Sequence, residues 1–160
     1  MYIGDWMERG ERYYPEAVAV VDVGKGEAGR FTYRQMNARA NRLAGFLRDE
    51  VGVKPGERVG ILAMNCVEYL DALFACGKLG AVLVPFNWRS HPREIAALVE
   101  KTAPKVLIFG DDFRAGVAEI AASPACASVI CWLSLDGAGI AGSRDYGQAV
   151  QSRADRKSVV

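Results

Sequence analysis

Short, continuous apolar runs alternate over residues 58–133 with longer segments in which apolar residues recur every three or four positions. The short runs predict strands that are buried on both faces of a sheet, and the longer segments predict amphipathic helices. Strict alternation of the two is typical of a parallel sheet covered by helices. The pattern therefore predicts an α/β fold with βαβ repeats over 58–133, in which strands at 58–64, 81–86, 105–109 and 128–133 alternate with helices at 66–79, 92–103 and 113–123.

The segment before these repeats has a different pattern. Asp5 and Glu8 have the spacing of a capping box, so a short helix is expected over residues 6–13. Two short β-prone runs then flank the glycine-rich sequence GKGEAG, and this arrangement predicts a β-hairpin over residues 17–33. Over residues 134–160 we expect a loop, a short helix near 145–151 and a polar tail.

A long helix is predicted to begin after Thr32, whose side chain can form a capping box with Gln35, and to end at Gly52. Its expected core stripe consists of Tyr33, Met36, Ala40, Leu43, Leu47 and Val51. The arginines of this segment fall mainly on the opposite side, which predicts that they face solvent: Arg34, Arg39, Arg42 and Arg48.

The helix at 66–79 is apolar nearly all round, so we expect other elements to cover it on more than one side. Asn65 and Glu68 have the spacing of its N-terminal cap pair, and Gly80 is expected to end it.

Residues 24–29, GKGEAG, match the G-x-G-x-x-G spacing of dinucleotide-binding loops. In such a loop a helix begins within the glycines, because the N-terminus of that helix provides the free N–H groups that bind phosphate. Here a strand is predicted after Gly29, and Arg30-Phe31 stands where a P-loop needs Lys-Ser/Thr. The sequence therefore predicts a solvent-facing turn between two strands.

Composition limits the classes of protein to consider. With 160 residues, 51% of them hydrophobic and 24% charged, the chain has the size and balance of one globular domain. Its scattered charges sum to +1, which argues against a nucleic-acid surface. None of the four cysteines forms a C-x-x-C pair and there is a single histidine, so no metal site is predicted. The charged N-terminus and the lack of an apolar run of ~20 residues favour a cytoplasmic protein without a transmembrane segment.

A parallel sheet places its ligands at the carboxyl ends of its strands. The residues expected there are Met64 and Asn65, residues 85–89, residues 110–112, and Ser134. In the second group Asn87 can donate and accept hydrogen bonds, and Arg89 carries a fork of donors suited to phosphate or carboxylate. A structural interpretation of the same loop stays open, in which Asn87 shapes a turn, Trp88 packs and Arg89 is a solvated charge.

Asp111 and Asp112 resemble the acidic pair that holds magnesium in phosphorylation receivers. The other strand ends lack the further aspartate and the lysine that this role requires, so Asp112 is interpreted as a helix cap. His91 precedes Pro92 at the expected start of a helix, and no Ser, Cys or Asp is arranged beside it. It is interpreted as a helix-start residue. These residues define no catalytic group and no reaction.

The order of short sequence pieces adds information that no single piece carries. Over about 130 residues the chain resembles the N-terminal part of the adenylate-forming (AMP-binding) acyl-CoA synthetases, and residues 1–6, MYIGDW, look most like the fatty-acyl-CoA ligase branch. The matching pieces are Thr32-Tyr33, 41–44, 52–59, Asn65 with Glu68, 77–81 and 85–89.

The resemblance implies an enzyme that uses ATP and magnesium to convert a carboxylic acid, here a fatty acid, to an acyl-adenylate, and then forms a thioester with coenzyme A. In that family the phosphate loop, the magnesium-binding glutamate and the catalytic lysine lie beyond the part that this chain matches. The resemblance therefore implies that the chain is an incomplete N-terminal subdomain, inactive alone, and that it does not bind these cofactors tightly. It also implies that Arg89 contacts a coenzyme A phosphate.

Two further expectations follow from this assignment. An incomplete sheet would expose an open edge and the apolar helix at 66–79, which predicts self-association. The competing interpretation is a stand-alone α/β module that binds a small molecule or a partner without catalysis.

Overall fold

The four apolar runs predicted as strands all form strands, and they pair in parallel. The computed structural model of the protein describes residues 5–137 and 139–151. Its main sheet has five strands in the order β4-β3-β5-β6-β7. All four pairs are parallel, which confirms the predicted fold class. The strands are β3 (Arg58–Leu62), β4 (Val82–Pro85), β5 (Val106–Phe109), β6 (Cys131–Ser134) and β7 (Arg144–Asp145).

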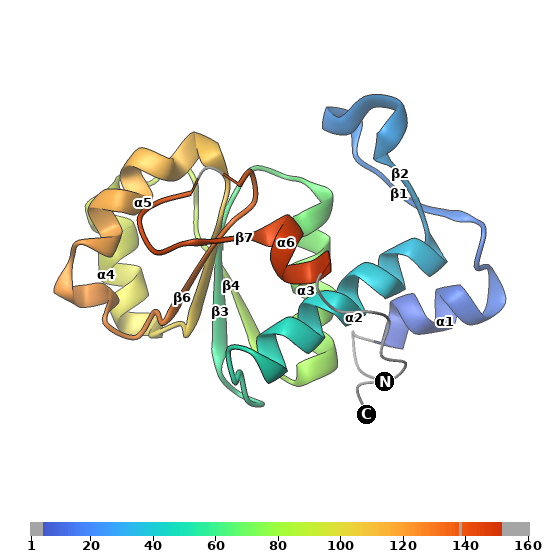
Figure 1. Cartoon of the computed structure of the whole chain (residues 1–160), viewed down its shortest axis with the longest axis horizontal. Coiled ribbons are helices and arrows are strands. Elements are labelled where there is room, and N and C mark those ends of the chain that lie inside the picture. Colours follow the sequence, from blue (N-terminus) through green and yellow to red (C-terminus); the bar gives the residue numbers. More distant parts are fainter. Residues whose placement is uncertain (1–4, 138, 152–160) are drawn as a thin grey trace.

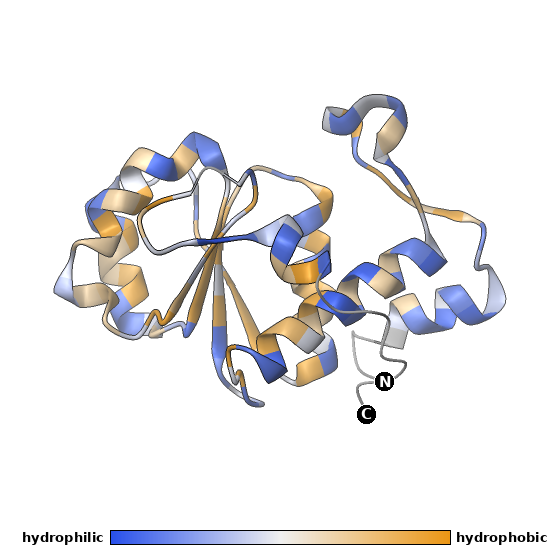
Figure 2. Ribbon diagram, in the orientation of Figure 1, coloured by the Kyte–Doolittle hydropathy of each residue, from blue (hydrophilic) through white to orange (hydrophobic). Residues whose placement is uncertain are grey.

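Helices cover both faces of this sheet, because side chains along each strand point alternately to opposite faces. One face packs against α2 (Tyr33–Asp49), α3 (Val67–Leu79) and α6 (Tyr146–Gln151), and the other packs against α4 (Pro92–Thr102) and α5 (Arg114–Ala121) (Figure 1). Figure 2 shows hydrophobic residues along the central strands. The chain therefore forms three layers.

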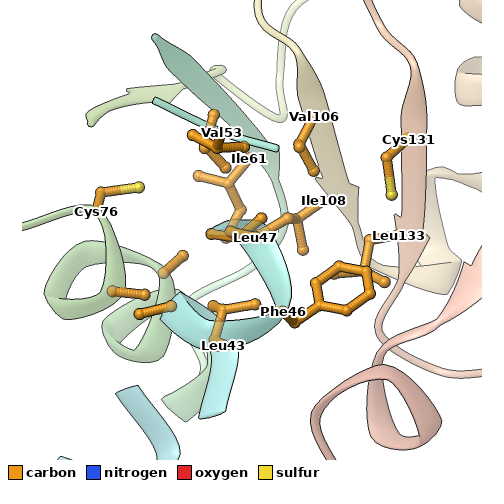
Figure 3. Packing of buried hydrophobic residues seen from close by; sticks show 14 of the residues in the cluster. Leu43, Phe46, Leu47, Val53, Ile61, Cys76, Val106, Ile108, Cys131 and Leu133 are labelled. Carbon is orange, nitrogen blue, oxygen red and sulfur yellow. The ribbon is translucent and has the colours of Figure 1, made fainter. Parts of the chain in front are cut away.

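The larger core cluster lies between α2, α3 and the sheet. Leu43, Phe46 and Leu47 of α2 point toward the sheet residues Ile61, Ile108 and Leu133 (Figure 3). On the other face a second cluster is formed by Leu62, Phe86, Leu107 and Phe109 with residues of α4 and α5.

The N-terminal region forms the predicted hairpin. Strands β1 (Val18–Val21) and β2 (Arg30–Thr32) pair antiparallel, and the 3₁₀ turn η1 (Val23–Gly29) joins them. A Cβ on Gly29 would lie 2.0 Å from the carbonyl oxygen of Asp22, so this glycine is required by the close approach of the turn to itself. Helix α1 (Asp5–Tyr13) precedes the hairpin and packs against α2.

Helix α2 begins as predicted, with both hydrogen bonds of the Thr32–Gln35 capping box present. It ends three residues earlier than expected, at Asp49. Val51 continued the apolar period in the sequence, but the chain leaves the helix at Glu50 and Val51 packs on the core from the following loop. Gly52 then adopts a positive φ of 74°.

The prediction that Arg39 faces solvent is wrong. Its guanidinium makes three hydrogen bonds to the carboxylate of Asp71 in α3, at 2.6–3.0 Å, and lies 5.0 Å above the Phe31 ring. The side chain of Asp71 is completely buried and also accepts a 2.7 Å hydrogen bond from the Tyr146 hydroxyl of α6. This network joins α2, α3 and α6.

The cap expected from Asn65 at the start of α3 is also wrong. Cys66 occupies the cap position without a side-chain hydrogen bond, and the carboxylate of Asp22 in the hairpin accepts a 2.9 Å hydrogen bond from the Val67 N–H. At the other end Gly80 ends α3 with a φ of 67°, as predicted.

Every residue of α3 is buried or half-buried. Because α2 packs along α3 within this chain, the expectation that the helix at 66–79 would be exposed is wrong.

The end of the described region adds a strand that the sequence did not reveal. Arg144 and Asp145 pair with Leu133 and Ser134, and α6 follows at the position expected for the short helix. A two-residue strand has too few residues for an alternating pattern. The tail expected after residue 151 and the sequence MYIG at residues 1–4 lie outside the described residues. In the parts of the chain that the structure describes, no helix has the length and hydrophobicity to cross a bilayer.

Candidate functional site

A cleft of about 360 Å³ lies at the carboxyl ends of β3, β5 and β6. It is therefore at the place where parallel sheets bind their ligands. Its walls come from the residues after each of these strands and from one hairpin residue: Lys25, Ala63, Met64, Cys66, Glu68, Gly110, Asp111, Asp112, Phe113, Leu135 and Asp136.

Asp136 connects two loops on the acidic side of the cleft. Its carboxylate accepts a 2.6 Å hydrogen bond from the Asp111 N–H, which ties the loop after β6 to the loop after β5. The Asp111 carboxylate lies 3.4 Å from the Arg114 guanidinium. Both carboxylates therefore have protein partners inside or beside the cleft.

The interpretation of Asp112 as a helix cap is wrong. A 3₁₀ turn over residues 111–113 separates β5 from α5, so the helix begins one residue later than expected and Phe113 occupies its cap position without a side-chain bond. Asp112 is exposed and lines the cleft.

On the opposite side of the cleft, Lys25 of the hairpin is paired with Glu68 of α3. Lys25 Nζ lies 3.1 Å from Glu68 Oε1, and Arg39 Nη2 lies 3.2 Å from the same oxygen. Burial acts to raise the pKa of Glu68, but its backbone hydrogen bond and these two cations outweigh burial and lower the pKa. Glu68 is therefore held as a carboxylate between α2 and the hairpin turn.

Cys66 lies at the mouth of the cleft and is half-buried. Burial raises the pKa of its thiol to about 11, and the charge of Glu68 adds to this effect. Because only the thiolate is a strong nucleophile, Cys66 is poorly suited to covalent catalysis at neutral pH.

The Asn87 loop lies beside the cleft and does not line it. The Asn87 side chain accepts a 3.0 Å hydrogen bond from the Arg89 N–H and so shapes the turn. The Trp88 ring packs against Phe113, with ring centroids 6.3 Å apart, and the exposed Arg89 guanidinium lies 4.5 Å above the Trp88 ring. This arrangement supports the structural interpretation of Asn87 and Trp88, and it places the Arg89 guanidinium over the Trp88 ring.

His91 begins α4 as predicted. Its Nδ1 accepts a hydrogen bond from the Arg93 N–H, and Glu94 completes a capping box by accepting from the His91 N–H. The histidine is therefore a helix cap.

The predicted site residues are only partly brought together. Met64 and residues 110–112 share the cleft, whereas Asn65 lines a separate hollow and Ser134 is buried behind the cleft. Sequence reasoning missed Asp136, which lies two residues beyond β6 and would have been found by extending that strand end. It also missed Lys25, because no local signal connects the hairpin turn to this edge of the sheet.

Within the residues that the structure describes, no group of three or more His, Cys, Asp or Glu side chains is arranged to hold a metal ion. The cleft therefore presents polar side chains on two walls and lacks a complete set of metal ligands of its own.

A profile of the AMP-binding enzyme family matches residues 7–158, nearly the whole chain. The chain belongs to the AMP-binding enzyme family. This confirms the resemblance inferred from the order of the short sequence pieces. The cleft is thus a feature of an AMP-binding enzyme.

Relatives of the chain carry the names of a CoA synthase and a CoA ligase. A feruloyl-CoA synthase of Amycolatopsis is 39% identical over 120 residues, which are 75% of this chain and 23% of the relative. A long-chain-fatty-acid–CoA ligase of Thermus thermophilus is 39% identical over 105 residues, 66% of this chain and 19% of the relative. The match spans about a fifth of the length of these curated relatives.

The fold is also found in a solved structure. The N-terminal domain of FACL13 from Mycobacterium tuberculosis superposes with a TM-score of 0.88 at 29% identity, covering 100% of this chain and 38% of that domain. The three-layer architecture therefore occurs within a larger domain in this relative.

Proposed function

We propose that the chain is the N-terminal portion of an ATP-dependent acyl-CoA synthetase. In the proposed reaction a carboxylate attacks the α-phosphorus of ATP and releases pyrophosphate. The thiol of coenzyme A then attacks the acyl carbon of the acyl-adenylate, forming the thioester and releasing AMP and a proton. The proposed acid is a fatty or other apolar carboxylic acid.

The observation that carries this proposal is the family match over residues 7–158. Two further observations support it. Two relatives at 39% identity are named feruloyl-CoA synthase and long-chain-fatty-acid–CoA ligase. The cleft also lies at the carboxyl edge of the sheet, where this fold class binds its ligands.

The described residues do not fit the phosphates of ATP or a magnesium ion. Residues 24–29 form a turn that is followed by the strand β2, and Gly29 packs against the Asp22 carbonyl, so no helix N-terminus faces outward there. In the cleft, Asp136 is engaged by the Asp111 N–H and Asp111 by Arg114. We therefore derive no step through ATP or magnesium from these residues, and we propose that the 160 residues alone are inactive.

Arg89 fits an anionic group better than any other residue of its loop. Its guanidinium is exposed, carries a fork of donors, and is held over the Trp88 ring at 4.5 Å. We propose that Arg89 contacts a phosphate of coenzyme A in the complete enzyme.

The first experiment measures ATP–pyrophosphate exchange by the purified chain with ferulate and with a long-chain fatty acid. For the 160 residues we expect no exchange above the buffer value. We expect exchange by the longer synthetase of which the chain is proposed to be the N-terminal portion. Exchange by the 160 residues alone would contradict the proposed inactivity. Absence of exchange by the longer protein with every acid tried would contradict the synthetase.

The second experiment compares coenzyme A binding by Arg89→Ala, Arg89→Lys and the control Arg93→Ala in that longer protein. Arg93 is an exposed arginine four residues away in the first turn of α4. We expect weaker binding by roughly five-fold or more for Arg89→Ala, because charge-assisted hydrogen bonds to phosphate are strong. Equal affinities in Arg89→Ala and Arg93→Ala would remove the assignment.

A further inference from the structure

The hairpin turn is held to the body of the protein mainly by polar contacts. We call residues 22–29 the strap. Asp22 Oδ2 accepts the hydrogen bond from the Val67 N–H, and Lys25 forms the ion pair with Glu68. Residues 23–28 all belong to the exposed part of the surface, and Val23 is 87% exposed.

The strap forms a wall of two neighbouring hollows. Lys25 lines the cleft at the carboxyl edge of the sheet. Asp22 and Val23 line a second, mainly apolar hollow of about 290 Å³, together with residues of β1 and the start of α3. Cys66 lines both hollows, so it lies directly behind the strap.

The strands of the hairpin pack on α2 and α3 through Ala19, Val20 and Phe31. These strands have four and three residues, and their register is interrupted between Val18 and Val20. Among the described residues, no member of the strap belongs to this apolar cluster. The Asp22 and Lys25 contacts are therefore the main connection between the strap and α3.

We propose that the strap is a gate on the cleft. It opens as a unit when the contacts of Asp22 and Lys25 break, while the sheet and α2 stay folded. Opening removes Lys25 from the wall of the cleft, joins the cleft to the apolar hollow, and exposes Cys66 and the first N–H groups of α3. The proposal concerns access to the cleft and does not rest on the proposed synthetase activity.

The main test is amide hydrogen exchange of the 160-residue chain, measured residue by residue. In Asp22→Ala the amides of Val67 and Lys25 are expected to exchange roughly five-fold faster or more, since a lost helix cap has an effect of this size. The amides of Leu107 and Ile108 in β5 should keep their rates. Glu27→Gln is the matched control, because Glu27 is an exposed acid of the same strap, whereas the described polar contacts with α3 are made by Asp22 and Lys25.

Unchanged exchange at Val67 and Lys25 in Asp22→Ala would overturn the gate. Equal acceleration in β5 would also overturn it, since the strap would then not open as a separate unit. The same acceleration in Glu27→Gln would show an unspecific charge effect and would likewise reject the proposal.

A second measurement uses the wild-type chain and so does not depend on a variant that folds. N-ethylmaleimide alkylation of Cys66 is followed while potassium chloride is raised from about 0.05 to about 0.5 M, because salt screens exposed ion pairs. We expect the rate to rise at least about two-fold in the wild type. In Lys25→Met we expect a rate that is already high and does not respond to salt. A rate that is independent of both salt and Lys25 would contradict the gate.

Discussion

Asp71 is the residue on which three helices converge. Burial raises the pKa of its carboxyl group, while hydrogen bonds from Arg39 and Tyr146 act in the opposite direction. A buried carboxylate is tolerated only where such partners compensate for lost hydration. Each partner should therefore contribute measurably to stability.

Removal of the Tyr146 hydroxyl tests this network. Tyr146→Phe is expected to lower the free energy of unfolding by about 1–3 kcal/mol, because a buried charged acceptor loses a hydrogen bond. Urea denaturation followed by circular dichroism measures the change. Tyr13→Phe is the control, since Tyr13 is exposed and its substitution should change the free energy by less than about 0.5 kcal/mol. Equal midpoints for both variants would show that the Tyr146 hydroxyl does not support Asp71.

The cysteines give a second prediction at the residue scale. Burial raises the pKa of Cys66 to about 11 and that of Cys76 to about 12. Since thiolates are the reactive species, iodoacetamide at pH 7.5 should modify both residues at least about ten-fold more slowly in the folded chain than in urea. Peptide mass spectrometry at timed intervals measures the rates. Folded Cys66 reacting as fast as unfolded Cys66 would contradict the expected suppression.

At the scale of elements, the contact between the hairpin and α3 should depend on pH. Burial acts to raise the pKa of Glu68 above its ordinary value of 4.5. Its backbone hydrogen bond, Lys25 and Arg39 outweigh burial, so the pKa is lowered in the folded chain. A carboxyl group whose pKa is lowered by folding stabilises the folded state at pH values above its ordinary pKa. This stabilisation is lost as the pH falls through the pKa of the folded state. Asp71, with a raised pKa, contributes with the opposite sign.

A comparison with Glu68→Gln isolates the effect of Glu68 from that of Asp71. The wild type should be more stable than Glu68→Gln near pH 6, and the difference should shrink as the pH falls below about 4. Urea unfolding at several pH values measures it. Glu119→Gln on α5 is the control, because Glu119 is exposed and lies away from the strap. A difference that is constant from pH 6 to pH 3 would contradict the expected titration.

Elements whose boundaries depend on neighbouring residues were predictable from the sequence. Thr32 with Gln35, His91 with Pro92, and Gly80 act within one helical turn, and each begins or ends its helix as expected. Asp112 is a residue for which this local reasoning failed. A 3₁₀ turn follows β5 and α5 begins only at Arg114, so Asp112 does not cap the helix.

Contacts between distant residues explain most of what was missed. Asp22 caps α3 from 45 positions away, and Tyr146 reaches Asp71 across 75 positions. Lys25 enters the cleft through the same fold-dependent approach of the hairpin to α3. No periodicity or local spacing contains this information, so the carboxyl edge could be predicted as the site while one of its walls could not.

At the scale of the whole molecule, β4 is one edge of the main sheet and β7 is the other. The N–H of Val82 donates to the carbonyl of Glu57, just before β3, and that of Phe86 donates to the carbonyl of Ile61. In the alternating pattern the outward-facing positions are therefore 83 and 85. Position 85 is a proline, which has no N–H to donate. The N–H of Leu83 is therefore the outward-facing donor of β4. Self-association of the chain stays a prediction, and this edge strand is a poor template for it.

Replacement of Pro85 should favour dimerisation of the chain through the β4 edge. Pro85→Val restores an outward N–H, so we expect a larger dimer fraction than in the wild type by sedimentation velocity at high concentration. Leu83→Val is the matched control, because it changes a side chain on the same strand and keeps the set of donors. Identical sedimentation of Pro85→Val and Leu83→Val would show that the proline does not protect the edge.

The long-range cap of α3 also has a consequence for synthesis of the chain. Ribosomes deliver the N-terminal residues first, so Asp22 is already available when Val67 emerges 45 residues later. The first turn of α3 thus meets its acceptor as soon as it can form. A circular permutant that placed residues 5–32 after α6 would reverse this order, and newly made α3 would have to wait for its cap.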